Sequence, residues 1–489
     1  MKVLFSPVYI ATPHFETELE LMLKHVNSGD EVYVLQCNEN LFSCEMNPKH
    51  LKGTCFKCKS RFKTGISMIE NIKILHYPEL QINYDQLDDK FNNIDELKNY
   101  SIEGIDLGIG VASSLIDRYN FDHKLDTTHY SKEIKLELKS AYLSFKTFEK
   151  IINDIKPDLV YIFNGRFSTL LPLLLCAEKY NIKYFTHERT GGKLNKYTLY
   201  ENSIPHLFDY AGKEIEELWD LVPNNKKSGE NYFNERRNRI IQSWYSFTAN
   251  QEYDLLPANI PVNRTIISIF NSTIGEYTAV RGCENPFTFF KDEYDCLSTI
   301  FNYYRNDNTL QFYLRIHPNL SGYNNTQINQ LKSFIKKYDN VEIILPESPV
   351  DTYKLVDVSD KVIVFGSMVG VEASFWGKPV IALATALYKD IDCCYWPQTF
   401  EEFNLMIKNE LVPKDRVGAL KYGNWEKERG IDFKYVKLES LLKGKFLNKY
   451  IKMNTFQKII YYWLRIFEIK DFKELYQIII KKLRISKSI

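Results

Sequence analysis

The sequence predicts an α/β fold of two Rossmann-like domains, each built on a parallel sheet, followed by a C-terminal helical tail. Short apolar, β-branched runs alternate with stretches of helical periodicity, which is the pattern of strands joined by crossover helices. The chain has 489 residues, a length that accommodates two domains with ample cores. A basic, amphipathic C-terminus predicts the tail.

The first domain is predicted over residues 1–254. It opens with a strand, a helix and a strand, and after a less regular middle it returns to the same alternation. In chain order we predict strand 3–5, helix 16–26, strand 31–36, helix 132–153, strand 159–163, helix 169–180 and strand 183–186. A charged helical stretch over 213–246 follows, and the segment 255–261, which contains two prolines, is the predicted linker.

The second domain is predicted over residues 262–435, and polar motifs follow several of its strands. Strand 265–270 ends in Asn271-Ser272-Thr273, and strand 312–316 ends in His317-Pro318-Asn319. Strand 341–345 leads to Pro346-Glu347-Ser348, and strand 362–365 leads to Gly366-Ser367 before a helix and a further strand at 380–383. Because parallel strands present their carboxyl ends at one edge of a sheet, we expect these motifs on one rim.

The turn at Gly366 and Ser367 is the strongest of these signals. A glycine there lets backbone N–H groups approach a ligand, and the following helix points its positive end at the same place. Such a turn favours a phosphate, although a helix packed on a parallel sheet without any ligand has the same pattern. His317, at the end of the neighbouring strand, can donate a hydrogen bond to a phosphate oxygen.

Together the motifs resemble those of the bacterial capsule and surface-polysaccharide glycosyltransferases of the GT-B type. The matching segments are Phe163-Asn164-Gly165-Arg166-Phe167, His187-Glu188-Arg189-Thr190-Gly191-Gly192, Arg315-Ile316-His317-Pro318-Asn319, Pro346-Glu347-Ser348-Pro349-Val350-Asp351-Thr352-Tyr353 and Phe365-Gly366-Ser367-Met368-Val369-Gly370-Val371-Glu372-Ala373. In order and spacing they cover most of residues 1–430. The resemblance implies two domains facing a central cleft and the transfer of a sugar from a nucleotide-activated donor.

The donor-binding residues predicted from these motifs lie in the second domain. They are Asn271, Ser272, Thr273, Glu276, Arg315, His317, Asn319, Glu347, Ser348, Gly366, Ser367, Gly370 and Glu372. Glu372 resembles the carboxylate that binds ribose hydroxyls in many GT-B enzymes. The family usually has an acidic pair near residue 276, whereas Ile274-Gly275-Glu276 retains one carboxylate.

The acceptor-binding residues are predicted in the first domain, after its strands. They are His14, Asn164, Gly165, Arg166 and Arg189. For the base that activates the acceptor hydroxyl, Glu188 is our first choice, His187 the second and His14 the third. A salt bridge between Glu188 and an arginine is the alternative reading. We expect His317 and Ser367 to stabilise the leaving nucleotide electrostatically, without a catalytic metal.

Four of the nine cysteines, Cys37, Cys44, Cys55 and Cys58, fall in a short insertion over residues 37–58. A Cys-x-x-Cys pair with two more thiols nearby is what a structural zinc site needs. An iron–sulfur cluster and four free thiols are the alternatives.

The tail over residues 441–489 holds twelve Lys or Arg and three Asp or Glu, a net charge of +9. Apolar residues repeat at helical spacing from 456 to 467 and again from 472 to 483, which predicts two amphipathic basic helices. They either pack on the body or lie on an anionic membrane surface, and we favour the membrane. The N-terminus lacks the features of a signal peptide and no apolar run is long enough to span a bilayer, so we expect a cytoplasmic protein, peripheral on the inner face of the membrane.

The predicted function is transfer of a sugar from a nucleotide-activated donor to a surface-polysaccharide acceptor, either a glycan or a lipid-linked glycan. A polyol-phosphate transferase, a nucleotide-sugar 2-epimerase and a non-catalytic assembly subunit are the alternatives. The overall net charge of +1 argues against nucleic acid as a partner.

Overall fold

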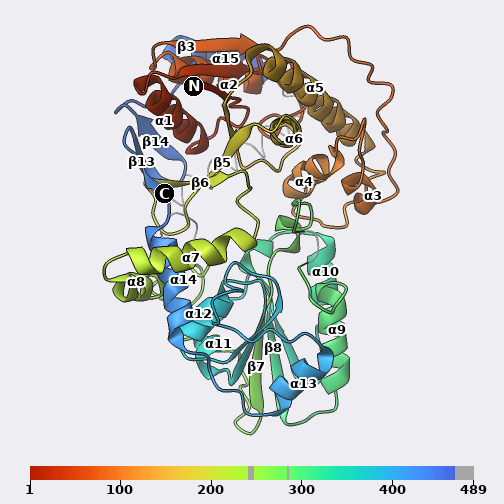
Figure 1. Ribbon diagram of the computed structural model, residues 1–489. Helices are drawn as coiled ribbons and strands as arrows, with labels where there is room; N and C mark the ends of the chain where they lie inside the picture. The colour runs from red at the N-terminus through yellow and green to blue at the C-terminus, as the bar shows by residue number, and fades with distance from the viewer. Residues whose placement is uncertain (241–246, 284–285, 469–489) are drawn as a thin grey trace.

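A computed structural model describes residues 1–240, 247–283 and 286–468 (Figure 1). Two α/β domains, each around its own sheet, lie one above the other in the view. The first domain is coloured mainly red to yellow, and the second green to blue. Both sheets are largely or wholly parallel, so the predicted pair of Rossmann-like domains is confirmed.

The first sheet has seven strands in the order β12-β6-β5-β4-β1-β2-β3. The first five strands in sequence run parallel, β6 is antiparallel to β5, and β12 is antiparallel to β6. The strands are β1 Lys2–Phe5, β2 Glu31–Gln36, β3 Ile72–His76, β4 Leu159–Phe163, β5 Lys183–Arg189, β6 Lys196–Glu201 and β12 Ile431–Asp432. The central strand β4 is buried at every residue, because helices cover both of its faces.

The helices of this domain are α1 His14–Asn27, α2 Lys52–Ile66, α3 Ile94–Lys98, α4 Gly108–Arg118, α5 Ser131–Ile155 and α6 Leu171–Lys179. The predicted helices 16–26, 132–153 and 169–180 correspond to α1, α5 and α6. The region predicted as less regular contains three more helices and strand β3.

The second sheet has five parallel strands in the order β11-β10-β7-β8-β9. They are β7 Thr265–Phe270, β8 Leu310–Arg315, β9 Val341–Ile344, β10 Lys361–Phe365 and β11 Val380–Ala384. Helices α9 Glu293–Tyr304, α10 Thr326–Lys332, α11 Thr352–Val358, α12 Val369–Phe375 and α13 Phe400–Lys408 surround it, with 3-10 turns η1 Ile274–Glu276 and η2 Pro318–Leu320 after β7 and β8. Strands β8, β10 and β11 are buried throughout, which leaves their carboxyl ends to carry the polar motifs.

Three helices connect the domains: α7 Asp209–Leu221, α8 Asn225–Arg237 and α14 Arg416–Glu428. Helix α14 packs against both α7 and α8. The helical stretch predicted over 213–246 is therefore two helices, with Pro223 in the break between them. Residues 241–246 of that prediction lie outside the described residues.

After α14 the chain returns to the first domain. Strand β12 joins the first sheet, and the hairpin β13 Val436–Ser440 and β14 Lys443–Phe446 packs on α1. The side chain of Glu20 on α1 is fully buried and accepts the backbone N–H groups of Lys434, Tyr435 and Val436. Both ends of the described chain thus build the first domain.

The first predicted tail helix is observed as α15 Thr455–Glu468, and it contacts α2. Glu468 accepts the backbone N–H of Gly53 at 2.8 Å. The second predicted tail helix, 472–483, lies outside the described residues. Within residues 1–240, 247–283 and 286–468, no helix combines the length and the apolar character needed to cross a bilayer.

Candidate functional site at the domain interface

The loops after β7, β8 and β10 bond directly to one another at the carboxyl edge of the second sheet. The side chain of Asn271 accepts the backbone N–H of His317 at 2.8 Å, and Ser272 donates its hydroxyl to the carbonyl of Phe365 at 2.7 Å. Asn319 donates to Glu276 at 3.1 Å. The predicted donor-binding motifs, dispersed over about a hundred residues, are thus brought together.

His317 lies half-buried at this edge. Burial, together with the positive charges of Arg315 and Arg236, lowers the pKa of its imidazole to about 4, so the ring is neutral at pH 7. Nδ1 accepts the backbone N–H of Asn319 at 3.2 Å, which leaves the proton of the neutral ring on Nε2. His317 can therefore donate one hydrogen bond through Nε2, and it carries no positive charge at pH 7.

The turn after β10 has the backbone conformation that the sequence predicted. Gly366 has a φ of +70°, and a Cβ there would lie 3.0 Å from the carbonyl oxygen of Thr385. At Gly370 a Cβ would lie 2.5 Å from the hydroxyl of Tyr388. Both positions require glycine, Gly366 mainly for its conformation and Gly370 for packing. Ser367 is 6% exposed, and its hydroxyl accepts the N–H of Val369 at 3.4 Å.

Arg315 is hydrogen-bonded to the loop after β9, and its side chain does not reach solvent. Its guanidinium donates to the carbonyls of Leu345 and Ser348. The side chain is 2% exposed, and burial lowers its pKa to about 10. Ser348 is half-buried in that loop and Glu347 is exposed. The arrangement favours a structural role for Arg315, whereas a direct contact with a ligand stays a prediction.

Arg236, at the end of α8, is a residue that sequence reasoning missed. Its Nε donates to the carboxylate of Glu372 on α12 at 2.6 Å, and its charge acts on His317. Glu372 is 2% exposed, so one of its oxygens already has a buried partner. The ribose-binding role of Glu372 stays a prediction, which now requires Arg236 to share that carboxylate or to move.

In the first domain, Glu188 is the most accessible of the predicted bases. Its side chain is 22% exposed, and its oxygens accept hydrogen bonds from the side chain of Asn164 and the backbone N–H of Arg189, both at 3.0 Å. His14 lies close, with its Nδ1 3.6 Å from Glu188 and its Nε2 3.5 Å from the guanidinium of Arg189. Burial, then Arg189 and His187, lower the pKa of His14 well below its usual range, so it is neutral.

His187 is fully buried, and its Nε2 lies 3.4 Å from the carboxylate of Glu18 on α1. Burial raises the pKa of Glu18. His206, which the sequence did not single out, lies 3.3 Å from the side chain of Asn164, and burial lowers its pKa to about 3. A side chain with no exposed surface cannot touch a substrate in this conformation, which makes His187 a poorer base than Glu188.

Arg166 joins the two halves of the site. It donates to the backbone carbonyl of Glu276 in the second domain at 3.0 Å and to Asp117 in the first at 3.1 Å. Burial, opposed by Arg166, raises the pKa of the Glu276 carboxyl to about 7. Because Glu276 in turn bonds Asn319, a continuous chain of contacts runs from the predicted acceptor motif to the predicted donor motif.

The four cysteines of the 37–58 insertion lie outside this interface. All four are free thiols, and burial raises the pKa of each, that of Cys58 to about 12. Among the described residues, no three histidine, cysteine or acidic side chains gather closely enough to hold a metal ion. The thiols therefore do not fit a zinc site as arranged, and zinc stays an unsupported prediction.

Two α/β domains with parallel sheets, and strand-end motifs in contact across their interface, define the GT-B architecture. Residues 235–406 match the family model described as capsule polysaccharide biosynthesis protein. That segment begins at the end of α8 and contains all the predicted donor-binding residues. The resemblance to capsule polysaccharide biosynthesis proteins is thus confirmed over roughly a third of the chain. A comparison with curated proteins finds no match.

Solved structures are similar only at a low level. The Thermosulfurimonas dismutans KpsC β-Kdo 2,4 transferase is 12% identical, covers 63% of this chain and 88% of its own, and has a TM-score of 0.36. UDP-GlcNAc 2-epimerase from Neisseria meningitidis, bound to UDP-GlcNAc, is 12% identical over 86% of this chain and 98% of its own, with a TM-score of 0.26. The Streptomyces glycosyltransferase SsfS6, complexed with thymidine diphosphate, is 11% identical over 87% and 95%, with a TM-score of 0.24. TM-scores this low carry no argument about activity.

Proposed function

We propose that the protein is a glycosyltransferase that moves a sugar from a nucleotide-activated donor to a growing surface polysaccharide. The observation that carries the proposal is the interlocked set of loops after β7, β8 and β10, inside the segment that matches the capsule polysaccharide family. Three strand ends of a parallel sheet that gather Asn, Ser, His and a glycine turn form a surface suited to phosphates.

On the donor side, the Nε2–H of His317 donates to a phosphate oxygen of the nucleotide. The glycine turn at Gly366 lets the backbone approach the same phosphates. These contacts stabilise the negative charge that develops on the nucleotide as the glycosidic bond breaks. A neutral donor next to the phosphate serves this purpose without a proton transfer.

On the acceptor side, Glu188 takes the proton of the attacking hydroxyl. Asn164 and the backbone N–H of Arg189 hold its two oxygens in place, which fixes the direction of the carboxylate. His14, neutral and close to Glu188, orients the same group. The acceptor is a glycan or a lipid-linked glycan, and Arg166 and Arg189 line its side of the interface.

A thermal-shift panel with CMP, CDP, UDP, GDP and their sugar conjugates tests the donor side, because a ligand that binds the folded state raises the melting temperature. We expect one nucleotide to raise it selectively, and His317→Ala to abolish that shift. His129→Ala, at an exposed histidine of the first domain, is the matched control and should keep it. If no nucleotide shifts the folded protein, a non-catalytic assembly subunit becomes the better explanation.

We also propose that α15 rests on an anionic membrane at the cytoplasmic face. Phe456, Ile459, Trp463 and Ile466 follow one another at helical spacing and are 59–70% exposed, although the helix is anchored on α2. An apolar, aromatic stripe in a segment of net charge +9 is typical of helices at a lipid interface.

Flotation with vesicles tests this second proposal. We expect the protein to float with vesicles that contain phosphatidylglycerol and to remain behind with pure phosphatidylcholine, because the tail is basic. Ile459→Ser with Trp463→Ser should abolish flotation. Leu405→Ser, at a leucine that is 59% exposed on α13, is the matched control. Flotation that survives the double substitution would rule out α15 as the contact.

A further inference from the structure

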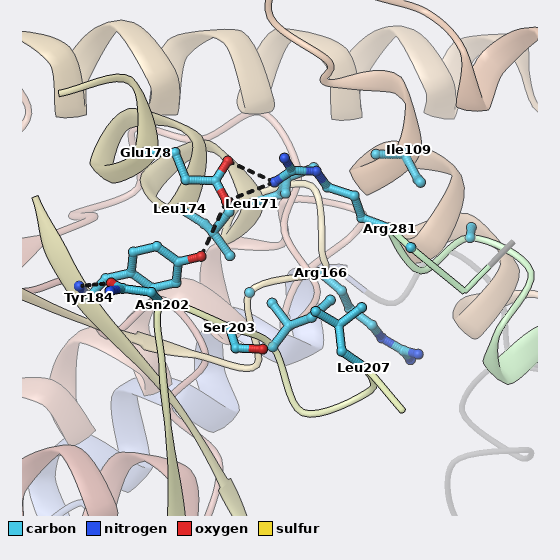
Figure 2. A pocket seen from close by; sticks show the side chains of 14 residues that line it. Ile109, Arg166, Leu171, Leu174, Glu178, Tyr184, Asn202, Ser203, Leu207 and Arg281 are labelled. Atoms are coloured by element: carbon cyan, nitrogen blue, oxygen red, sulfur yellow. Dashed lines mark hydrogen bonds and ion pairs between the residues drawn. The ribbon is translucent and has the colours of Figure 1, made fainter. Parts of the chain in front are cut away.

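A cavity of about 240 Å³ lies between the two domains, beside the candidate acceptor site (Figure 2). The first domain contributes Ile109 on α4, Leu171 and Leu174 on α6, and Leu207 in the loop after β6. The second domain closes it with Ala279 and Arg281 from the loop after η1.

The walls of this cavity are mainly aliphatic, and the charged groups at its rim bond to one another. At the rim, Arg281 donates to both oxygens of Glu178 at 2.9 and 3.1 Å, and Tyr184 donates to the same carboxylate at 3.2 Å. Figure 2 shows Glu178 joined to both partners, with Leu171 and Leu174 beside it. A sugar ring would bring hydroxyls that the aliphatic wall cannot satisfy, at a cost for each one left unpaired. The cavity therefore fits an apolar group.

Three consecutive residues connect the cavity to the candidate base. Asn164 contacts the carboxylate of Glu188, while Gly165 and Arg166 line the cavity. The guanidinium of Arg166 points away from the Glu178–Arg281 pair in Figure 2 and reaches Asp117 and the carbonyl of Glu276. The candidate base and the cavity therefore lie at opposite ends of this short segment.

We propose that this cavity is an acceptor subsite for an apolar group, an alkyl chain or an aromatic ring, carried by the acceptor at a distance from the reacting hydroxyl. The inference rests on the proposed function, because it assigns the group to the acceptor of that reaction. Since both domains form the walls, an acceptor seated here also stabilises the contact between them.

Binding of octyl β-glucoside, kept below its micelle concentration, tests the subsite by calorimetry, with methyl β-glucoside as the matched probe. We expect saturable binding of one octyl glucoside per chain, on the order of 100-fold tighter than methyl glucoside, because several methylenes leave water. Ser203→Leu, which narrows the cavity, and Leu207→Asn, which makes its wall polar, should each weaken octyl binding about tenfold or more. Leu405→Asn, at an exposed leucine of the second domain, should not.

Octyl binding that persists in both cavity variants, with melting temperatures showing that they are folded, would overturn the proposal. So would its loss in Trp463→Ser, because the exposed stripe of α15 would then be the binding surface. A transfer assay with the donor found in the nucleotide panel completes the test: the octyl chain should lower KM and leave kcat within about twofold, and Ser203→Leu should erase that difference. Equal KM values for octyl and methyl acceptors contradict the subsite alone, whereas absence of nucleotide binding contradicts the proposed function.

Discussion

The two domains hold their candidate residues in different ways. In the second domain, backbone groups and short side chains of several loops bond to one another at the strand ends, as Asn271 does with His317. In the first, the candidates are side chains packed around Glu188, with His14 and Asn164 at most 5% exposed. The fold itself holds a site that is made of many loops in place. A site that is made of a few side chains can instead lose one group by a single substitution. Loss of the base should therefore stop turnover and leave donor binding intact.

Of the substitutions that distinguish the roles of the two domains, Glu188→Gln should have the largest effect. Removing a general base should lower the rate of transfer by about 10² to 10⁴-fold, because the acceptor hydroxyl must then lose its proton to water. The nucleotide-induced thermal shift should stay unchanged, since Glu188 belongs to the other domain. Glu201→Gln, at an exposed glutamate ending β6, should leave both readouts as in the wild type. A rate within tenfold of the wild type would remove Glu188 from the mechanism.

Stability should respond strongly where the returning chain meets the first domain. Glu20→Ala leaves three backbone N–H groups near the start of β13 without their acceptor, and we expect a loss of about 3 kcal/mol in the free energy of unfolding. Urea unfolding measures it, with Glu70→Ala, at an exposed glutamate, as the control. A change below about 0.5 kcal/mol would mean that the returning segment contributes little to this domain.

We expect a smaller, pH-dependent effect on stability from Glu276, which contacts Arg166 of the first domain and Asn319 of the second. Its pKa is about 7 in the folded protein and lower, near its usual 4.5, in the unfolded chain. The folded state therefore binds the proton more tightly, so its contribution to stability is present below about pH 4.5 and is lost as the pH rises toward 7. Unfolding curves from pH 4.5 to 8 should show that Glu276→Gln removes about 3 kcal/mol of this decline.

The pKa of His317 is shifted in the opposite direction to that of Glu276. The wild type must therefore be compared with Glu276→Gln to isolate the effect of Glu276 on stability. Its pKa of about 4 lies below the usual 6.5, so its contribution is lost as the pH falls below 6.5. That contribution is the same in the wild type and in Glu276→Gln and cancels in the difference. An identical pH dependence of the two proteins would contradict the raised pKa of Glu276.

The smallest effect concerns the cysteine insertion. With four half-buried free thiols whose pKa values are raised, we expect a strong chelator to leave the melting temperature unchanged within about a degree. Elemental analysis of the purified protein is the direct measurement. If the wild type contained one equivalent of zinc and Cys55→Ser contained none, the zinc prediction would be supported. The thiols would then converge on the metal.

Strands with unbroken apolar runs were predictable from the sequence. Residues 159–163 and 265–270 coincide with β4 and β7, because a strand covered on both faces leaves a continuous signal. Strand β6, with the sequence KYTLYE, was missed, since its apolar and polar residues are mixed and it is antiparallel to its neighbour. Strand β12 has only two residues, and no local pattern indicates that it pairs with β6.

Candidate site residues were predictable from the sequence where a motif follows the end of a strand. Residues of the site that belong to no such motif were not. His317 and Gly366 were found in this way, and the structure brings their loops together. Arg236 and His206 belong to no motif, and only the fold places them beside Glu372 and Asn164. The burial of His187 also depends on α1, which lies far away in the sequence.

The return of the chain to its starting domain has a consequence for synthesis on the ribosome. The buried carboxylate of Glu20 accepts hydrogen bonds from N–H groups that are translated more than four hundred residues later. The strands of the second domain, which all lie between residues 265 and 384, are translated before those partners exist. The domain that begins at the N-terminus is therefore the last to be completed.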